Sequence, residues 1–148
     1  MHLTLHADYS LRVLLYLATH GGRPTSTQEM ADAYGISKHH LVRVVQTLAG
    51  LGVVDARAGR SGGVTLGREP KDINVGKVLR AAEPDFHLVE CFDAARNTCP
   101  ITPVCGLKGV LAEAREAFLS VLDRYTLADL LVRSRSDLAA HFLPARVG

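Results

Sequence analysis

The stretch from Cys91 to Cys105 constrains the fold more than any other, because it holds all three cysteines of the 148-residue chain. Seven residues separate the first two cysteines and five separate the last two, and the second interval contains Pro103 directly before Val104. Proline fixes φ and lacks an N–H group, so this stretch cannot form a regular helix or a central strand. We therefore predict an ordered loop whose shape depends on something other than a backbone hydrogen-bond ladder.

Several chemistries are compatible with three cysteines in such a loop. Three thiolates could hold one iron–sulfur cluster and leave one coordination position for another type of residue. A zinc ion bound by three cysteines and His87 is an alternative, although zinc sites usually contain closely paired cysteines. Three independent free thiols are the simplest interpretation for an intracellular chain. A structural disulfide is less favoured, since it would leave one cysteine over and nothing marks the chain as secreted.

The N-terminal part of the chain predicts an amphipathic helix over 7–19, because apolar residues recur there at helical spacing. Asp8 lies near the expected start of this helix, where unpaired N–H groups favour a carboxylate. From the residues alone, we expect Asp8 to cap the helix. The sequence His20-Gly21-Gly22 should end it.

The next segment predicts a helix-turn-helix. Ser26 opens a capping box for a first helix over 26–34, and Gly35 provides a tight turn. Ser37 then caps a second helix over 38–50. Two short helices joined by a brief glycine turn are typical of this motif.

The second helix has one apolar and one polar face. The apolar face, expected to be buried, consists of Leu41, Val44, Val45 and Leu48. The polar face consists of Ser37, Lys38, His39, His40 and Arg43. Its N-terminal end is the part that enters the major groove of DNA in this motif. Considered alone, these polar residues could equally form a solvated surface.

The segment 53–66 favours DNA binding, because it is typical of a β-hairpin with a flexible tip. A hairpin directly after a helix-turn-helix forms the wing of a winged helix. The tip region combines the residues Arg57, Gly59, Arg60, Ser61, Gly62 and Gly63. Glycine lets backbone N–H groups approach phosphates, and arginine favours a narrow minor groove. Residues 1–68 also carry seven Lys and Arg against four Asp and Glu, whereas the remainder carries ten against eleven.

Beyond the wing, a short helix over 73–83 leads to the cysteine loop, and a long helix follows over 107–125. The apolar stripe of the long helix repeats at three- and four-residue steps, so it needs a partner surface. The helix could fold back on the winged helix, but we prefer a symmetric homodimer. Helix-turn-helix proteins commonly read the two half-sites of a palindromic DNA operator, one helical turn apart.

We therefore expect a mostly α fold with a small β wing. The expected organisation is a winged helix-turn-helix domain (1–68), a short helix with a cluster-binding loop (69–106), a dimerisation helix with a short terminal helix (107–133) and a loose tail (134–148). No apolar run is long enough to cross a bilayer and no signal-peptide pattern is present, so we expect a cytoplasmic protein without a membrane partner. No general base lies beside a cysteine and there is no phosphate loop, so we expect no enzyme.

A winged helix, a three-cysteine loop and a long helix, in this order, resemble the bacterial iron–sulfur transcription regulators that include the nitric-oxide sensor NsrR and the cluster-assembly regulator IscR. The resemblance covers roughly residues 1–132 and is closest to the NsrR branch. It is carried by residues 3–4 with 8–9, and by 34–37, 59–63, 99–108 and 123–130. In the IscR branch a histidine lies three residues after the last cysteine, whereas this chain has Lys108.

This resemblance implies a homodimeric repressor with one 4Fe–4S cluster per subunit, or 2Fe–2S as the alternative. Cys91, Cys99 and Cys105 would be ligands, and Asp8 of the other subunit would supply the fourth, in place of its capping role. The iron–sulfur form would bind DNA through Ser26 and the polar residues of the second helix and the wing. Nitric oxide would act as the effector that releases the DNA. A regulator of the same fold that senses iron supply, cluster redox state or thiol oxidation is the alternative.

Overall fold

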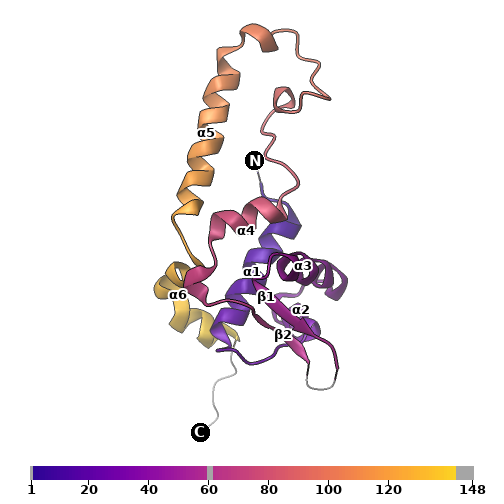
Figure 1. Cartoon of the computed structure of the whole chain (residues 1–148), viewed down its shortest axis with the longest axis vertical. Helices are drawn as coiled ribbons and strands as arrows, with labels where there is room; N and C mark the ends of the chain where they lie inside the picture. Colours follow the sequence, from indigo (N-terminus) through magenta and orange to yellow (C-terminus); the bar gives the residue numbers. More distant parts are fainter. Residues whose placement is uncertain (1, 60–61, 143–148) are drawn as a thin grey trace.

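The computed structural model describes residues 2–59 and 62–142, and it consists of a helical body with a long arm. Figure 1 shows a body that contains the helix-turn-helix and the hairpin, with a long helix and the cysteine loop extending away from it. The hairpin is antiparallel and is the one sheet in the described ranges. The predicted fold class, mostly α with a small β wing, is confirmed.

Helix α1 (Leu5–Thr19) runs through the centre of the body and begins two residues earlier than predicted. Its N-cap is Thr4, whose Oγ1 accepts a hydrogen bond from the N–H of Ala7 at 3.2 Å. Asp8 already lies inside the helix, because its own N–H donates to the carbonyl of Thr4. The expectation that Asp8 caps this helix is therefore wrong.

The helix-turn-helix is formed by α2 (Thr27–Tyr34) and α3 (Lys38–Gly50), as predicted. Ser26 accepts a hydrogen bond from the N–H of Glu29 at 3.0 Å, which is the first half of the capping box. The Glu29 carboxylate interacts in turn with the backbone of Ser26, as the box requires, and it also pairs with Arg23. Gly35 adopts the left-handed conformation, φ 63° and ψ 33°, which allows the sharp turn between the helices. Ser37 occupies the N-cap position of α3 without a side-chain capping bond in the described structure.

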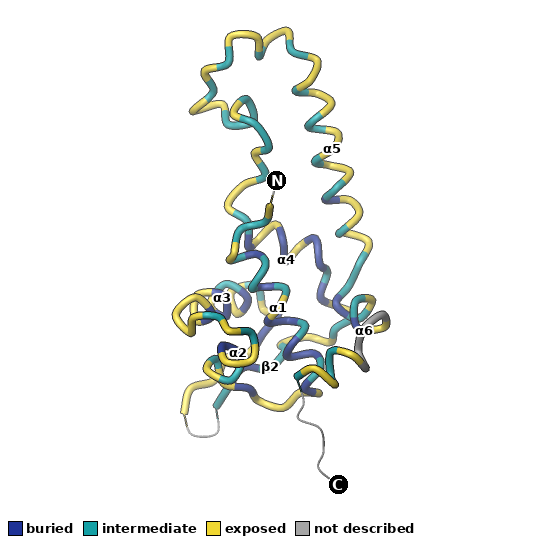
Figure 2. The backbone as a smooth tube through the Cα atoms, turned by 180° about the vertical axis from the view of Figure 1, so that it is seen from behind, coloured by how far each residue is buried: buried dark blue, intermediate teal, exposed yellow. Residues whose placement is uncertain are grey.

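The predicted apolar face of α3 is buried in the main core. Leu41, Val44 and Leu48 are fully buried, and Val45 is 6% exposed. The same core contains side chains from α1, α2, the hairpin and helix α6 (Leu127–Phe142). In Figure 2 the buried segments of the backbone are dark blue and lie within the body. Because α3 is packed on several elements at once, its polar face is held in a defined direction.

The hairpin pairs β1 (Val54–Arg57) with β2 (Gly63–Leu66), and Arg57 lies opposite Gly63. The tip-side end of β2 is also joined to the segment just before α2. Thr25 and Val64 exchange two backbone hydrogen bonds, at 3.0 and 2.8 Å. The predicted tip residues Arg60 and Ser61 lie outside the described residues.

The last helix, α6 (Leu127–Phe142), is much longer than predicted. Its start is as expected, because Asp129 Oδ2 accepts from the N–H of Thr126 at 2.7 Å. The expectation of a loose tail from residue 134 is wrong as far as Phe142. The ring of Phe142 packs against Tyr16 and Tyr34, each at a centroid distance of 5.1 Å, so α6 ends on the core of the body. Residues 143–148 lie outside the described residues.

After the hairpin the chain adds one more helix to the body, and the arm then consists of the cysteine loop and one long helix. A 3₁₀ turn, η1 (Pro70–Asp72), precedes α4 (Val75–Ala82), and the loop contains the 3₁₀ turns η2 (Glu90–Phe92) and η3 (Thr102–Val104). Helix α5 (Gly106–Asp123) has Leu119 as its one buried residue. Figures 1 and 2 show the loop-side half of α5 standing clear of the body. The helix therefore does not fold back along the winged helix.

Candidate DNA-binding surface and cysteine pocket

The three cysteines line one cavity of about 440 Å³ at the end of the arm. Cys91 lies in η2, Cys99 lies in the loop, and Cys105 stands at the N-terminal boundary of α5. All three are free thiols of intermediate burial. Pro100, Ile101, Leu107 and Leu111 supply apolar walls, and Lys108 supplies a cation. The fold therefore brings the three cysteines to one pocket. That they bind a ligand there remains a prediction.

Side-chain hydrogen bonds hold the loop around this pocket in place of a backbone ladder. The Asn97 side chain accepts from the N–H of Cys99 and from the hydroxyl of Thr102, each at 3.2 Å. The Thr102 hydroxyl also contacts the carbonyl of Cys99 at 3.0 Å. Glu90 accepts from the N–H of Thr98 at 3.3 Å. Asn97 and Thr102 thereby fix the path of the chain around Cys99.

The three thiols share one pocket, and this donor set bears on the kind of metal group that it could hold. In the ranges that the structure describes, no three His, Cys, Asp or Glu side chains converge closely enough to hold one metal ion. A structural zinc site requires four ligands around one ion, and His87 lines a neighbouring cavity rather than the one with the cysteines. Cluster thiolates ligate separate iron atoms, so they can be further apart. Three thiols lining one pocket are a donor set that can hold an iron–sulfur cluster.

Asp8 does not line the cysteine pocket of its own chain. Its carboxylate pairs with Arg12 one helical turn later, with nitrogen–oxygen distances of 2.7 and 3.0 Å. This carboxylate raises the pKa of the Arg12 guanidinium, which also lies over the rings of Tyr9 (5.7 Å) and Tyr34 (6.0 Å). Sequence analysis missed Arg12, although its four-residue spacing from Asp8 on one helix is typical of an ion pair.

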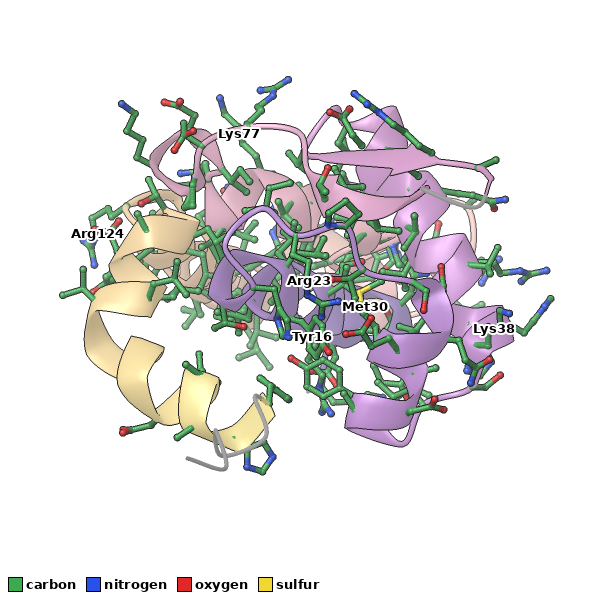
Figure 3. All side chains as sticks on the ribbon, turned by 90° about the horizontal axis from the view of Figure 1, so that it is seen from below. Tyr16, Arg23, Met30, Lys38, Lys77 and Arg124 are labelled. Carbon is green, nitrogen blue, oxygen red and sulfur yellow. The ribbon has the colours of Figure 1, made fainter. Side chains whose placement is uncertain are left out.

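The candidate DNA-binding residues lie on the outer face of the helix-turn-helix. Lys38, His39, His40 and Arg43 are exposed on α3, and Figure 3 shows Lys38 at the edge of the molecule, pointing away from the core. Ser26 and Ser37 are exposed at the starts of α2 and α3. Arg57 is exposed on the hairpin, and the backbone there is closed by a 3.0 Å bond from the N–H of Gly62 to the carbonyl of Gly59. Lys38, His39 and Arg43 can therefore reach a bound duplex without rearrangement of the core.

Two contacts that could not be read from the sequence join α1 to α3. His6 Nε2 and Thr47 Oγ1 lie 3.0 Å apart, at hydrogen-bond distance. The ring of Tyr9 lies 6.3 Å from that of His40, which is on the candidate DNA-binding face. Because Asp8 is on the same turn of α1, a displacement of this turn would be transmitted to α3.

Comparison with known proteins relates this architecture to transcription regulators. Residues 3–133 match the family model of Rrf2, described as iron-dependent transcriptional regulators. The chain is 52% identical over 139 residues to the HTH-type transcriptional regulator NsrR of Bacillus subtilis (strain 168), covering 93% of this chain and 94% of that protein. It is 48% identical over 132 residues to NsrR of Geobacillus kaustophilus (strain HTA426), covering 88% and 90%.

Solved structures of similar shape include two named regulators. IscR of T. potens has a TM-score of 0.72 and 27% identity, covering 90% of this chain and 88% of that one. CymR (YrzC), the global cysteine regulator of B. subtilis, has a TM-score of 0.69 and 29% identity, covering 90% and 98%. None of the helices in the described ranges has the length and apolar character needed to span a membrane.

Proposed function

The chain belongs to the Rrf2 family of transcriptional regulators, and we propose that it is a dimeric repressor that binds a palindromic operator in its iron–sulfur form and releases it on exposure to nitric oxide. Its relatives are named as transcriptional regulators, so the chain is a DNA-binding regulator and not an enzyme. The single observation that carries the finer proposal is the common pocket of the three cysteines. We further propose that the protein acts in the cytoplasm, where thiols stay reduced.

In this proposal, Cys91, Cys99 and Cys105 hold the cluster, and Asp8 of the partner subunit completes its ligands. The cluster is of the 4Fe–4S type, with 2Fe–2S as the alternative. When bound, it supplies iron atoms that can accept nitric oxide. Oxygen is a weaker ligand for such iron than thiolate is, so the Asp8 carboxylate would be the protein ligand most readily lost. Arg12 lies beside Asp8 in the free chain and would hold the released carboxylate.

A dimer through α5 is supported by the apolar residues that this helix leaves exposed. Leu107 and Val110 are each 62% exposed, and Val121 is 41% exposed. Apolar side chains repeated along one exposed helix are typical of a surface that a partner covers. A second copy of α5 would cover these side chains, and the resulting dimer would contain two winged-helix domains.

The contacts of α1 suggest how release of Asp8 would reach the DNA. His6 and Tyr9, on the same turn as Asp8, contact Thr47 and His40 of α3. A displacement of α1 by a few ångströms would shift α3 relative to its symmetry mate. Two half-sites about 34 Å apart could then no longer be engaged at the same time.

The test is an anaerobic titration with nitric oxide, in which the visible absorption and the affinity for an operator duplex are followed together. We expect the purified protein to contain iron and inorganic sulfide, to absorb in the visible, and to lose operator affinity as nitric oxide is added. Material without iron or sulfide that still binds its operator tightly would disprove the proposal. The family description as iron-dependent regulators favours iron supply as the second candidate signal. Loss of DNA binding on iron chelation but not with nitric oxide would select that alternative.

Substitution Arg60→Ala should weaken binding to specific and non-specific DNA alike, because an arginine in the predicted wing would neutralise a phosphate. The slope of the logarithm of affinity against the logarithm of salt concentration should fall by about 0.9. Arg124→Ala is the matched control, since Figure 3 places Arg124 on the opposite side of the molecule from Lys38. An unchanged slope in the Arg60 variant would count against a phosphate contact.

A further inference from the structure

The C-terminal end of α5 is attached to the body by a compact set of polar contacts, which we call the α4–α5 joint: Asn74, Gly76, Arg80, Asp123 and Tyr125. At its centre, the guanidinium of Arg80 pairs with both carboxylate oxygens of Asp123, Nη1 with Oδ1 and Nη2 with Oδ2, the latter at 2.8 Å. This hydrogen bonding lowers the pKa of Asp123 below its ordinary value. A bidentate pair restrains direction as well as distance.

Backbone contacts extend the joint to the turn that follows α5. Asn74 Nδ2 donates to the carbonyl of Asp123 at 2.7 Å, while Asn74 Oδ1 caps α4. The N–H of Val75 donates to the carbonyl of Tyr125 at 2.9 Å. The end of α5 is thus bound to the first turn of α4, although the two segments lie far apart in the sequence.

Gly76 is the residue that permits this close approach. A Cβ atom at this position would collide with the carboxylate of Asp123 and press on the guanidinium of Arg80. A glycine inside a helix weakens the helix by about 0.5–1 kcal/mol relative to alanine. Glycine at this position of α4 therefore leaves room for the Arg80–Asp123 pair, which packs directly against its Cα atom.

The rest of α5 is held much less firmly. Within its 18 residues, Leu119 is the buried one, and the helix leads directly to the cysteine pocket at its other end. A helix of this length extends about 27 Å, so a tilt of about 10° at the joint would move its far end by about 5 Å. Small changes at the joint therefore produce large displacements along the arm.

We propose that the Arg80–Asp123 pair, seated on Gly76, sets the angle between α5 and the winged-helix body, and through it the half-site spacing that the dimer reads. The inference rests on the proposed function, because it requires α5 to be the dimer contact. Both side chains are about two-fifths exposed, and exposed ion pairs contribute little to folding stability. The pair is thus better suited to fixing an orientation than to holding the fold together. Arg80 and Asp123 are positioning residues in this scheme, since neither touches the DNA.

The experiment measures how sharply the protein distinguishes half-site spacings. The probe is a duplex selected from random DNA by the wild-type protein, together with versions in which one base pair is inserted or deleted at the centre. One base pair rotates a half-site by about 34°, so the wild type should lose about tenfold or more in affinity. Asp123→Asn should reduce this discrimination to a few-fold. Arg80→Lys, which keeps the charge but loses the planar fork, should do the same.

Controls separate a loss of geometry from a loss of folding. The double variant Arg80→Asp with Asp123→Arg reverses the pair and should restore discrimination. Glu113→Gln removes an exposed carboxylate elsewhere on α5 and should leave discrimination intact. Circular dichroism and sedimentation should show folded dimers for each variant.

The possible outcomes are distinguishable. An equal loss of affinity at every spacing, or full discrimination in both Asp123→Asn and Arg80→Lys, would overturn the inference. A wild-type monomer, or a wild type that binds all spacings equally, would instead overturn the proposed dimeric function itself. Loss of discrimination in the two single variants, with restoration in the charge-reversed pair, would establish the joint as the element that sets spacing.

Discussion

Replacing Cys99 with alanine is expected to abolish both iron binding and specific DNA binding. Cys99 is the middle cysteine of the loop, and its backbone is held by Asn97 and Thr102 at the edge of the pocket. Removing this thiol leaves Cys91 and Cys105 as the cysteines of the chain, and two thiols would retain a cluster poorly. Operator affinity should fall by about 10³-fold or more, to the level of non-specific binding.

Iron and sulfide content, visible absorption and operator binding are measured on anaerobically purified protein. Ala95→Ser is the control, because Ala95 is exposed on the same loop and does not line the pocket. It should keep colour and affinity. A Cys99→Ala protein that retains iron and full operator affinity would refute the cluster assignment.

Leu41→Ala should cause the largest loss of stability on the candidate DNA-binding helix. Leu41 is fully buried in the main core, so truncation leaves a cavity that should destabilise the fold by about 2–5 kcal/mol. The midpoint of thermal unfolding should fall by roughly 5–15 °C. Thermal and urea unfolding followed by circular dichroism would measure both quantities.

The neighbouring residue provides a matched control. Val42 is on the same turn of α3 but is 38% exposed. Val42→Ala should change the unfolding free energy by about 0.5 kcal/mol or less. If the two substitutions destabilised the protein equally, the assignment of Leu41 to the buried face of α3 would be contradicted.

The helix-turn-helix could be predicted in detail because local interactions determine it. Ser26 caps α2 through a residue three positions away, and Gly35 makes the turn by its own backbone conformation. The face of α3 containing Leu41 follows from helical periodicity alone. Each of these signals involves residues within one or two turns of a helix, so each can be read without knowledge of the fold.

The error at Asp8 arose from competition between neighbouring residues, whereas the error in the last helix arose from a contact between distant ones. Asp8 has the right residue type for a cap, but Thr4 competes for that position and Arg12 takes the carboxylate. Phe142 is a single aromatic residue in a segment without a clear apolar pattern. Its contacts with Tyr16 and Tyr34 exist because α6 packs against α1.

The sequence by itself therefore determined the helix-turn-helix, the hairpin, the cysteine loop as irregular structure, and the family resemblance. Only the tertiary structure decided that the three thiols share one cavity, that α5 stands away from the body, and that Arg80 and Asp123 meet over Gly76. The physical reason is the range of the interactions. Capping, periodicity and turn conformation act between near neighbours, whereas the pocket and the joint require residues far apart in the chain to be brought together by packing.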